Sequence, residues 1–451
     1  MISSYTQEYM LRLKDLMANQ YAMLPKDQHD PNVHRGLRNA DGTGVLIGVT
    51  NIGSVQGYYM QDGARVPMPG KLYYRGISLE DIVESHRANG TFGFTEVVFL
   101  LLTGILPTKQ QLSEFETMLA EARQLPDGFM ESMILRSPSR DIMNQLSRSV
   151  LALYSYDDRP DDLSAENIMR QSIELVARFP TIVAHAHAAK RHYFDNKSLY
   201  IHNPKRQLNV AEDFLRMLRK DKKFTAEEAH LLDLMLMIHA EHGGGNNSTF
   251  VCRAMSSSNT DSYSAIAGAV GSLKGPLHGG ANAKVMEMFR NVQEHVKDHK
   301  DEDEISHYLT KILRGQANDG SGKIYGLGHA IYTESDPRCE LLKKYSREVA
   351  EKSGHMDELE LMMRIEKCGK PLITKLKNLD IPICANVDMY SGLIYDFLKI
   401  PPELFTPLFA IARVSGWCAN RMEEVLTCNR IHRPAYRAAV LRVPYTPIDQ
   451  R

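Results

Sequence analysis

A long series of segments with helical periodicity constrains the fold of this chain more than any other feature. From Ser78 onward, apolar residues recur at the 3.6-residue spacing that lines one face of an α-helix. The clearest such segments are Asp141–Tyr154, Ala165–Phe179, Val210–Leu218 and Ala226–His242. The chain shows neither the alternation of strands and helices expected of a parallel sheet nor an internal repeat. The sequence therefore predicts a mainly α-helical protein.

A glycine-rich stretch near the N-terminus predicts one small β element. The β-type runs Val45–Ile47 and Val55–Met60 lie within it. They are bounded by turn residues, of which Asp62-Gly63 is a good hairpin signal. This is the one convincing strand region in the first half of the sequence.

Local signals also place several helix starts. Thr108 with Gln111, and Ser78 with Asp81, have the spacing of a capping box, in which a hydroxyl and an acidic or amide side chain satisfy two backbone N–H groups. Thr95 is the expected N-cap of a short apolar helix that follows it.

Composition limits the partners and the compartment. Lys and Arg number 54 and Asp and Glu number 55, so the net charge of −1 gives no general attraction to nucleic acid or to an anionic membrane. The 6 cysteines are scattered without a CxxC pair, which favours a reducing compartment over a structural zinc site. Residues Met1–Gln20 resemble an amphipathic helix and lack the features of a secretory signal. We expect a cytoplasmic protein without a nucleic-acid or membrane partner.

One loop carries the residues of a carboxylate-binding site. Gly326-Leu327-Gly328 predicts backbone that turns tightly or approaches a ligand closely, and His329 follows it. Arg338 comes nine positions later, directly after a proline. A glycine loop, a histidine and a rigidly placed arginine can bind a carboxylate and polarise a neighbouring group. The alternative is a surface turn with an ordinary histidine.

Two histidine clusters have different interpretations, one structural and one as a ligand-contacting site. On a helix, His185 and His187 point about 200° apart, so we interpret them as structural residues. The helix that carries His239 and His242 must end at the glycines that follow, which favours ligand contact by His242 and Asn246. Their spacing of three differs from the i, i+4 spacing of a zinc protease motif, so a metal site on His239 and His242 is the weaker alternative.

Three further residues are candidates for chemistry. His278 precedes a predicted helix, whose dipole disfavours imidazolium and leaves a neutral donor. Asp388 falls in the first turn of another helix, where the dipole helps to keep the carboxylate ionised. Arg413 lies between Phe409 and Trp417 on an apolar stripe and requires an anionic partner. Each also has a plain structural interpretation as a turn or helix-end residue.

Together these motifs resemble the citrate synthase family, from about Leu72 to Pro434. The matching stretches, in the family's order, are Tyr74-Arg75-Gly76, Leu106-Pro107-Thr108, Pro180-Thr181-Ile182, His239 to Phe250, Gly275-Pro276-Leu277-His278-Gly279, Gly326 to His329, Asp336-Pro337-Arg338, Asn386-Val387-Asp388, Arg413 and His432-Arg433-Pro434. One such motif is weak, whereas this many in order is specific.

The resemblance implies a fold and a reaction. The fold would be a multi-helical homodimer, with a large domain formed by residues 1–281 and 399–451, an inserted small helical domain at 282–398, and a C-terminal tail that reaches the partner subunit. The reaction would be the condensation of acetyl-CoA with oxaloacetate to citrate and CoA. Coenzyme A enters as a thioester substrate, and the resemblance implies no tightly bound cofactor and no metal.

The resemblance also implies roles for the site residues. Asp388 would take a proton from the acetyl group, His278 would hydrogen-bond the thioester oxygen, and His329 would polarise the oxaloacetate keto group. The residues expected to hold oxaloacetate are His242, Asn246, Arg338, Arg413 and, from the partner subunit, Arg433. The residues expected beside CoA are Ile324, Gly326, Leu327 and Gly328.

The sequence departs from the family after His329. Many relatives carry a basic residue there, whereas this chain has Tyr332-Thr333-Glu334, so the contacts to the CoA phosphates are open. Three alternatives to a citrate synthase remain at this stage. They are a 2-methylcitrate synthase that uses propionyl-CoA, a metal-dependent hydrolase, and a non-catalytic protein that binds CoA or another metabolite.

Overall fold

The chain forms two compact units, of which one contains nearly all of the helices. A computed structural model describes residues 10–15, 17, 33–39, 43–62, 64–428, 430–436, 438 and 442–451. The terminal unit comprises Met1–Ile47 and His432–Arg451, and the main unit comprises Gly48–Ile431. Residues 10–15 and 17 of the predicted first helix are helical, and the rest of that prediction lies outside the described residues. The terminal unit also contains the 3₁₀ turns η1 (Arg35–Leu37) and η5 (Ile448–Gln450).

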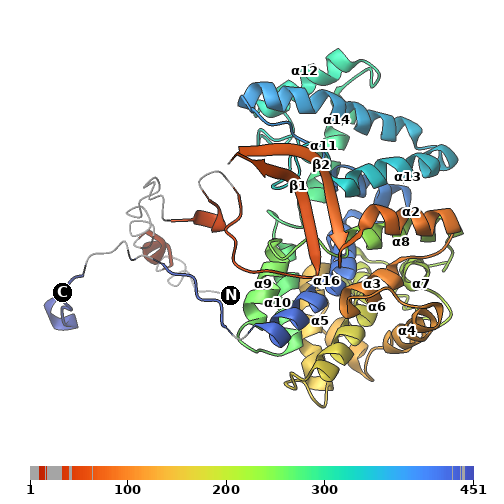
Figure 1. The fold of residues 1–451 in the computed structure, drawn as a ribbon, viewed down its shortest axis with the longest axis vertical. Helices are drawn as coiled ribbons and strands as arrows, with labels where there is room; N and C mark the ends of the chain where they lie inside the picture. The colour runs from red at the N-terminus through yellow and green to blue at the C-terminus, as the bar shows by residue number, and fades with distance from the viewer. Residues whose placement is uncertain are drawn as a thin grey trace. The chain divides into compact units, whose positions relative to one another are not determined.

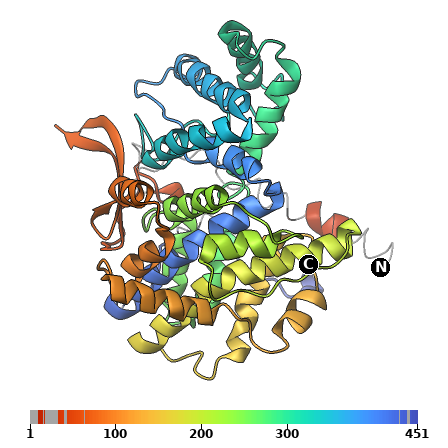
Figure 2. The ribbon, with the colours of Figure 1, turned by 90° about the vertical axis from the view of Figure 1, so that its right-hand side faces the viewer.

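The main unit is mainly α-helical, as the periodicity predicts. Its α-helices are α2 (Leu79–Asn89), α3 (Phe94–Thr103), α4 (Lys109–Ala122), α5 (Ile142–Leu153), α6 (Ala165–Asp195), α7 (Val210–Leu218), α8 (Ala226–His239), α9 (Asn247–Ser256), α10 (Ser262–Lys274), α11 (Ala281–His295), α12 (Glu302–Leu313), α13 (Pro337–Ser353), α14 (Met356–Lys377), α15 (Asp388–Phe397) and α16 (Phe405–Thr427). Shorter helical turns are η2 (Met130–Leu135), η3 (Tyr154–Tyr156) and η4 (Pro402–Leu404). Helices α11 to α14 gather at one end of the unit, and α3 to α6, α9 and α10 lie at the other (Figures 1 and 2).

Helix α16 is the centre of the core. It contacts α3, α6, α8, α9 and α10, and it is buried along most of its length. Its buried residues include Trp417, Arg413 and Arg421, which are among the largest fully buried side chains among the described residues. A helix surrounded by others must be apolar on nearly every face. Arg413 and Arg421 are polar residues of this helix that are buried in spite of this, and Arg413 belongs to the site described below.

The predicted helices agree with the structure at most boundaries. Helix α7 has the predicted limits, and α5 begins after an N-cap at Asp141 as expected. Helix α6 is longer than predicted, because it continues through Pro180 to Asp195. Burial on both sides of Pro180 stabilises this helix enough to tolerate the hydrogen bond that proline removes.

The helix caps show where local signals fail. The capping box of Thr108 and Gln111 is present. The side chain of Ser78 occupies its N-cap position without a capping hydrogen bond. The prediction for Thr95 is wrong because α3 begins at Phe94, two residues earlier than predicted, with Gly93 at the N-cap position. Its first N–H groups are satisfied by the buried carboxylate of Asp233, which accepts from the backbone nitrogen of Gly93 at 2.6 Å. A residue 140 positions away in the sequence thus caps this helix.

A three-stranded antiparallel sheet accounts for the predicted β element. Its strands are β1 (Gly53–Gln61), β2 (Ala64–Tyr74) and β3 (Ile77–Ser78), in the order β1-β2-β3. Gln61 pairs with Ala64 across the two strands, which confirms the predicted hairpin. The predicted strand at Val45–Ile47 is wrong because these residues form no strand. Strand β2 of the hairpin contacts α13. The hairpin is drawn in front of the helices in Figure 1.

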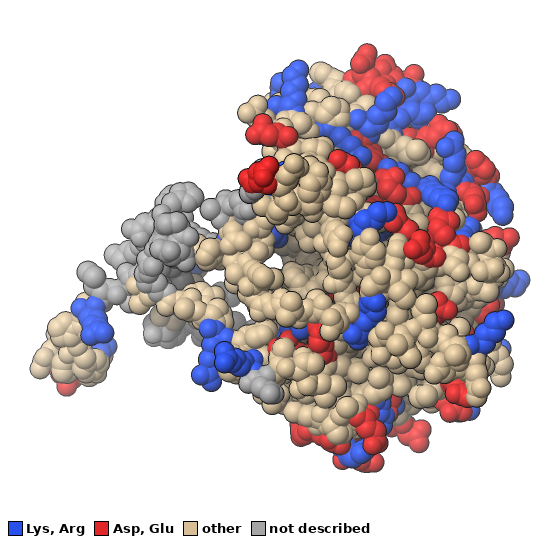
Figure 3. Space-filling model, viewed as in Figure 1, with Lys and Arg blue, Asp and Glu red and all other residues tan. Residues whose placement is uncertain are grey.

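The surface mixes both signs of charge. Over the end that carries α12, α13 and α14, acidic and basic side chains alternate (Figure 3). This agrees with the balanced composition and indicates that any anion must be held by particular arginines. Among the described residues, no helix has the length and apolar character needed to cross a membrane.

We predict that Asp233→Ala lowers the free energy of unfolding by about 1–3 kcal/mol, because it removes a buried acceptor and leaves backbone N–H groups unpaired. Urea unfolding followed by circular dichroism measures this change. Thr108→Ala, at the exposed capping box of α4, is the matched control and should cost about 1 kcal/mol or less. An Asp233 variant no less stable than the Thr108 variant contradicts the assignment.

Candidate active site

The glycine loop that precedes His329 pairs with the segment that leads into α15. The backbone nitrogen of Gly328 donates to the carbonyl of Cys384 at 2.8 Å, and that of Asn386 donates to the carbonyl of Gly326 at 2.9 Å. A Cβ on Gly326 would lie 3.0 Å from the Cα of Met389, so this backbone approach needs glycine, as predicted. The pairing brings the loop of His329 beside the first turn of α15.

Asp388 is the first residue of α15 and a carboxylic acid with a raised pKa. Burial raises the pKa of Asp388 to about 6, against the opposing effect of the positive charge of Arg338. The sequence interpretation, in which the helix dipole keeps this carboxylate readily ionised, is therefore wrong in direction, because desolvation outweighs the favourable charges. A carboxylate that gains basicity from its surroundings is suited to accept a proton near neutral pH.

His329 is held in one orientation by the backbone that follows it. Its Nδ1 atom accepts hydrogen bonds from the backbone nitrogens of Ile331 and Tyr332, both at 3.0 Å. Because Nδ1 accepts, the proton of the neutral ring lies on Nε2, which makes Nε2 the donor of this ring. The ring of Tyr332 stacks on His329 with centroids 4.5 Å apart, and the ring of His242 lies 5.3 Å away.

His278 has the opposite tautomer. The backbone nitrogen of Ser248 donates to its Nε2 atom at 3.3 Å, and the Ser248 hydroxyl lies 3.0 Å from the same atom. The ring proton is thus assigned to Nδ1. Burial first, and then the charge of Arg413, lower the pKa of His278 to about 4. The ring is neutral as predicted, but burial and a nearby cation cause this rather than the dipole of α11.

Arg413 projects from α16 into a buried cluster with unused hydrogen-bonding capacity. Its Nε donates to the carbonyl of His239 at 2.7 Å, and its guanidinium lies 4.7 Å from the ring centre of Phe409. The two terminal nitrogens of Arg413 are buried and have no hydrogen-bond partner among the described residues, and the same holds for Nε2 of His242. Unpaired buried donors are costly, so this cluster fits a bound anion.

The charge of Arg413 persists in this setting. Burial lowers the pKa of Arg413 to about 10, which still leaves it protonated at neutral pH, and Glu241 opposes the decrease. In turn, burial and the charges of Arg338 and Arg413 lower the pKa of His239 and of His242 well below the usual value. The imidazoles are neutral and the guanidinium is not.

Arg338 has a fixed orientation because Asp336 holds it. Its Nε and Nη2 atoms bind the two carboxylate oxygens of Asp336 at 3.0 and 2.7 Å, and both residues are buried. Asp336 is also the N-cap of α13, with Pro337 at the first helical position. The Nη1 atom of Arg338 takes no part in this pairing. The prediction of a rigidly placed arginine is confirmed.

The remaining predicted residues have other surroundings. The side chain of Asn246 accepts a hydrogen bond from the Ser248 hydroxyl at 2.9 Å, so it belongs to the network behind His278. The side chains of Ile324 and Leu327 pack at Gly369 of α14, which leaves only their backbone for a ligand. Arg433 belongs to the terminal unit, whereas the other predicted site residues belong to the main unit.

Two side chains complete the site without having been assigned a role from sequence. Ser248 receives the indole N–H of Trp417 at 3.2 Å and connects it to His278 and Asn246. Tyr332 contacts both His329 and Arg338. The guanidinium carbon of Arg338 lies 5.9 Å from the centre of the Tyr332 ring. Tyr332 has a weak local signal, because it follows His329 by three residues. Ser248 lies in the matching stretch His239 to Phe250, but its contact with Trp417 depends on α16 and has no local signal.

Neither histidine pair singled out in the sequence, His185 with His187 or His239 with His242, belongs to a metal-binding group among the described residues. His185 contacts the carbonyl of His202, and His187 contacts Glu403, so the two rings have different partners. Within the described ranges, no group of three or more His, Cys, Asp or Glu side chains is arranged to hold a metal ion.

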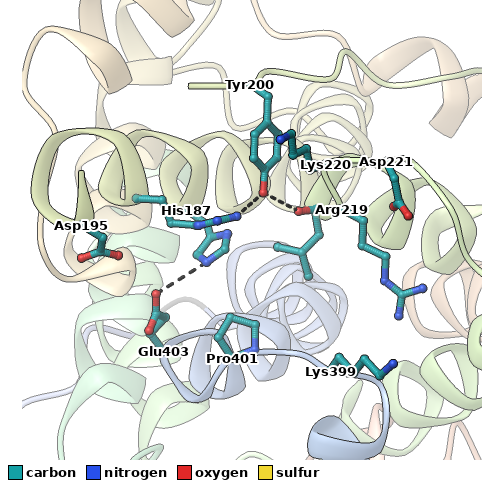
Figure 4. A pocket seen from close by; sticks show the side chains of 11 residues that line it. His187, Asp195, Tyr200, Arg219, Lys220, Asp221, Lys399, Pro401 and Glu403 are labelled. Carbon is teal, nitrogen blue, oxygen red and sulfur yellow. Dashed lines mark hydrogen bonds and ion pairs between the residues drawn. The ribbon is translucent and has the colours of Figure 1, made fainter. Parts of the chain in front are cut away.

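A cavity of about 670 Å³ lies elsewhere in the main unit and is lined by none of the predicted site residues. It lies between α6, the segment after α7 and the connection from α15 to α16 (Figure 4). Its polar groups engage one another, as in the pairing of His187 with Glu403 at 3.5 Å. The Tyr200 hydroxyl likewise donates to the carbonyl of Leu218 at 3.4 Å. This cavity is therefore separate from the catalytic candidates.

Comparison with known sequences identifies the family. A sequence model of the citrate synthase C-terminal domain matches residues 39–435. The citrate synthase of Synechocystis sp. is 34% identical over 365 residues, covering 81% of this chain and 84% of the relative. The 2-methylcitrate synthase of Shewanella oneidensis is 33% identical over 364 residues, covering 81% of this chain and 87% of the relative.

Solved structures agree in fold. Citrate synthase from Thermoplasma acidophilum, in a ternary complex with carboxymethyl coenzyme A and oxaloacetate, has a TM-score of 0.76 at 25% identity and covers 93% of this chain and 100% of its own. Citrate synthase from Thermotoga maritima has a TM-score of 0.73 at 29% identity, with 93% and 99% coverage. The chain belongs to the citrate synthase family, and it is an enzyme of the acyltransferase type. The resemblance found in the sequence is thereby confirmed.

We predict that Asp388→Asn stabilises the protein at alkaline pH. The pKa of Asp388 is about 6 in the folded chain and about 3.9 when unfolded, so folding disfavours the ionised form. The wild type therefore loses stability as the pH rises through about 6, and the amide variant does not. At about pH 8 the variant should be more stable by about 2 kcal/mol, with the difference vanishing near pH 4.

Thermal unfolding at both pH values measures this effect. Asp336→Asn is the matched control, since it breaks the buried pair with Arg338 and should destabilise the protein at both pH values. A loss of stability in Asp388→Asn at about pH 8 contradicts the assigned shift.

Proposed function

We propose that this enzyme condenses acetyl-CoA with oxaloacetate and hydrolyses the resulting thioester to citrate and CoA. The observation that carries the proposal is the buried Arg413, whose two terminal nitrogens lack partners among the described residues. In the same main unit, Asp388 has a pKa raised to about 6. An anion-binding cation and a carboxylate base suit the formation of a carbon–carbon bond with a dicarboxylate. The ternary complex of the Thermoplasma acidophilum enzyme, with an acyl-CoA analogue and oxaloacetate, supports this pairing of substrates.

Oxaloacetate would bind through its two carboxylates. Arg413 offers two unpaired guanidinium nitrogens, and Arg338 offers Nη1, since its other edge is bound to Asp336. His242 adds a neutral ring with an unpaired Nε2 atom. Charge-assisted hydrogen bonds from fixed arginines explain how a chain of net charge −1 can hold a dianion.

Enolisation requires a base and an oxyanion donor that act together. Asp388 would take a proton from the acyl carbon next to the thioester carbonyl. The electron pair then moves to the carbonyl oxygen, which accepts a hydrogen bond from Nδ1–H of His278. A neutral imidazole suits this role. The pKa of His278 is about 4, so the ring is uncharged near neutral pH and acts as a hydrogen-bond donor without giving up a proton.

Condensation and hydrolysis follow from the same positions. The enolate carbon attacks the keto carbon of oxaloacetate, while Nε2–H of His329 hydrogen-bonds the keto oxygen and then transfers its proton to the alkoxide. Water attacks the thioester carbonyl and the thiol of CoA leaves. The backbone of Gly326 to Gly328 would lie beside CoA, since the side chains of Ile324 and Leu327 pack inward.

We propose that the large domain comprises residues 1–281 and 399–451, and that residues 282–398 form the small domain. The gathering of α11 to α14 at one end of the main unit supports this division (Figure 1). The loop of His329 and the helix of Asp388 then belong to the small domain, whereas His242, His278 and Arg413 belong to the large one. Substrate binding would close the two domains on each other.

Propionyl-CoA defines the second candidate function, because a 2-methylcitrate synthase is 33% identical to this chain. One methylene changes transition-state binding by only about 1–3 kcal/mol, so both substrates must be tested. We expect thiol release with oxaloacetate to show a higher kcat/KM for acetyl-CoA than for propionyl-CoA. Asp388→Ala should lower kcat by about 10³-fold or more while oxaloacetate still binds.

A preference for propionyl-CoA would replace the first function with the second. Absence of thiol release with either substrate would contradict both. If Asp388→Ala retained wild-type turnover, another group would be the base.

We propose that the enzyme is a homodimer and that Arg433 contributes to the partner subunit's site. A mixture of Arg433→Ala and Asp388→Ala chains tests this arrangement. If Arg433 crosses between subunits, each mixed dimer contains one site with both residues intact. Equal mixing after reversible dissociation should then restore about 25% of wild-type activity, because half of the dimers are mixed and half of their sites are intact. No recovery would place Arg433 in its own subunit's site.

A further inference from the structure

The hairpin of β1 and β2 has an irregularity at the place where it meets the loop after His329. The register of the two strands shifts between Gln56 and Tyr58. Gly57 on β1 and Gly70 on β2 therefore lie outside the regular cross-strand pairs. A bulge of this kind leaves backbone N–H and C=O groups directed away from the ladder, where another segment can bind them.

The loop after His329 uses these groups. The hydroxyl of Thr333 donates to the carbonyl of Gly57 at 2.8 Å. The backbone nitrogen of Gly70 donates to the hydroxyl of Ser335 at 3.1 Å, and Pro69 forms a parallel bridge with Ser335. Two hydroxyl groups of the loop thus bind the hairpin at adjacent points of its two strands.

The two glycines allow this contact. A Cβ on Gly57 would lie 2.5 Å from the carbonyl oxygen of Ile331 and 2.6 Å from the Cα of Tyr332. A Cβ on Gly70 would collide with the carbonyl oxygen of Ser335. Both approaches are backbone against backbone, so no side-chain movement can relieve them.

The same loop residues orient His329. The backbone nitrogens of Ile331 and Tyr332 donate to its Nδ1 atom, and the Tyr332 ring stacks on it. Their peptide planes rest on Gly57, and the hydroxyl of Thr333 fixes the next residue. Movement of this backbone would rotate the imidazole and would remove the donors that keep the proton on Nε2.

The hairpin is also fixed at its base. The Tyr74 hydroxyl donates to the carbonyl of Met237 at 3.0 Å, near the end of α8. A Cβ on Gly53 would lie 3.0 Å from the side chain of Glu241, just before His242. The hairpin therefore connects the segment that carries His242 with the loop that carries His329.

We propose that Thr333 is a positioning residue, whose hydrogen bond to the hairpin fixes the backbone that orients His329. This inference rests on the proposed function for its effect on turnover. Thr333 lies four residues after His329, and its hydroxyl connects the loop to the hairpin. The hairpin acts as a support for the loop through that bond.

Thr333→Val and Thr333→Ser test the proposal, since valine keeps the shape without the hydroxyl and serine keeps the hydroxyl. We expect Thr333→Val to lower kcat about tenfold, with KM for oxaloacetate changed by less than about twofold, because the ring is misoriented while the arginines remain. Thr333→Ser should retain nearly full turnover. Wild-type kcat in Thr333→Val, or equal losses in both variants, would overturn the proposal.

Hydrogen exchange separates this inference from the proposed function. Thr333→Val should speed amide exchange in a peptide spanning 326–336, whether or not the wild type releases thiol from acetyl-CoA. An inactive wild type would refute the proposed function, and the exchange result would still decide the role of Thr333. Unchanged exchange in Thr333→Val would overturn that role. Gly57→Ala should speed exchange in the same peptide, whereas Gly48→Ala, where a Cβ meets nothing within 4 Å, should not.

Discussion

Two buried guanidinium groups, those of Arg338 and Arg413, supply the positive charge of the site. A charge removed from water is costly unless it is compensated, and two nitrogens of Arg413 have no partner among the described residues. Burial contributes most to the lowered pKa values of His239 and His242, and the charges of Arg338 and then Arg413 lower them further. The cations that attract an anionic substrate thus also keep the neighbouring imidazoles neutral. One arrangement of charge supplies both substrate affinity and uncharged hydrogen-bond donors.

The tautomers of the two central histidines have separate structural origins. His329 receives backbone N–H groups at Nδ1, whereas His278 receives one at Nε2. Each ring therefore presents a different nitrogen as its donor. The backbone carries out this selection, because an N–H group can only donate and its direction is fixed by the local fold. A substitution that moves this backbone would therefore change which ring nitrogen carries the proton.

Sequence reasoning identified the family and the main elements because their signals are local or strongly repeated. The loop Gly326 to His329 and the limits of α7 depend on neighbouring residues, and both were predicted. The cap of α3 by Asp233 and the passage of α6 through Pro180 depend on distant packing, and both were missed. The raised pKa of Asp388 has the same explanation, since burial arises from the assembled fold and outweighs the helix dipole. The position of Ser248 behind His278 likewise needs α16 in place.

The chain contains a single tryptophan, Trp417, and it is fully buried with its indole N–H on the Ser248 hydroxyl. That hydroxyl is in turn 3.0 Å from His278. The ultraviolet emission of this protein therefore comes largely from one indole, whose hydrogen-bond partner Ser248 contacts a proposed oxyanion donor. A change in the protonation or the partners of His278 alters the electric field at that indole. The fold thus contains its own optical probe of the site, which reports without any added label.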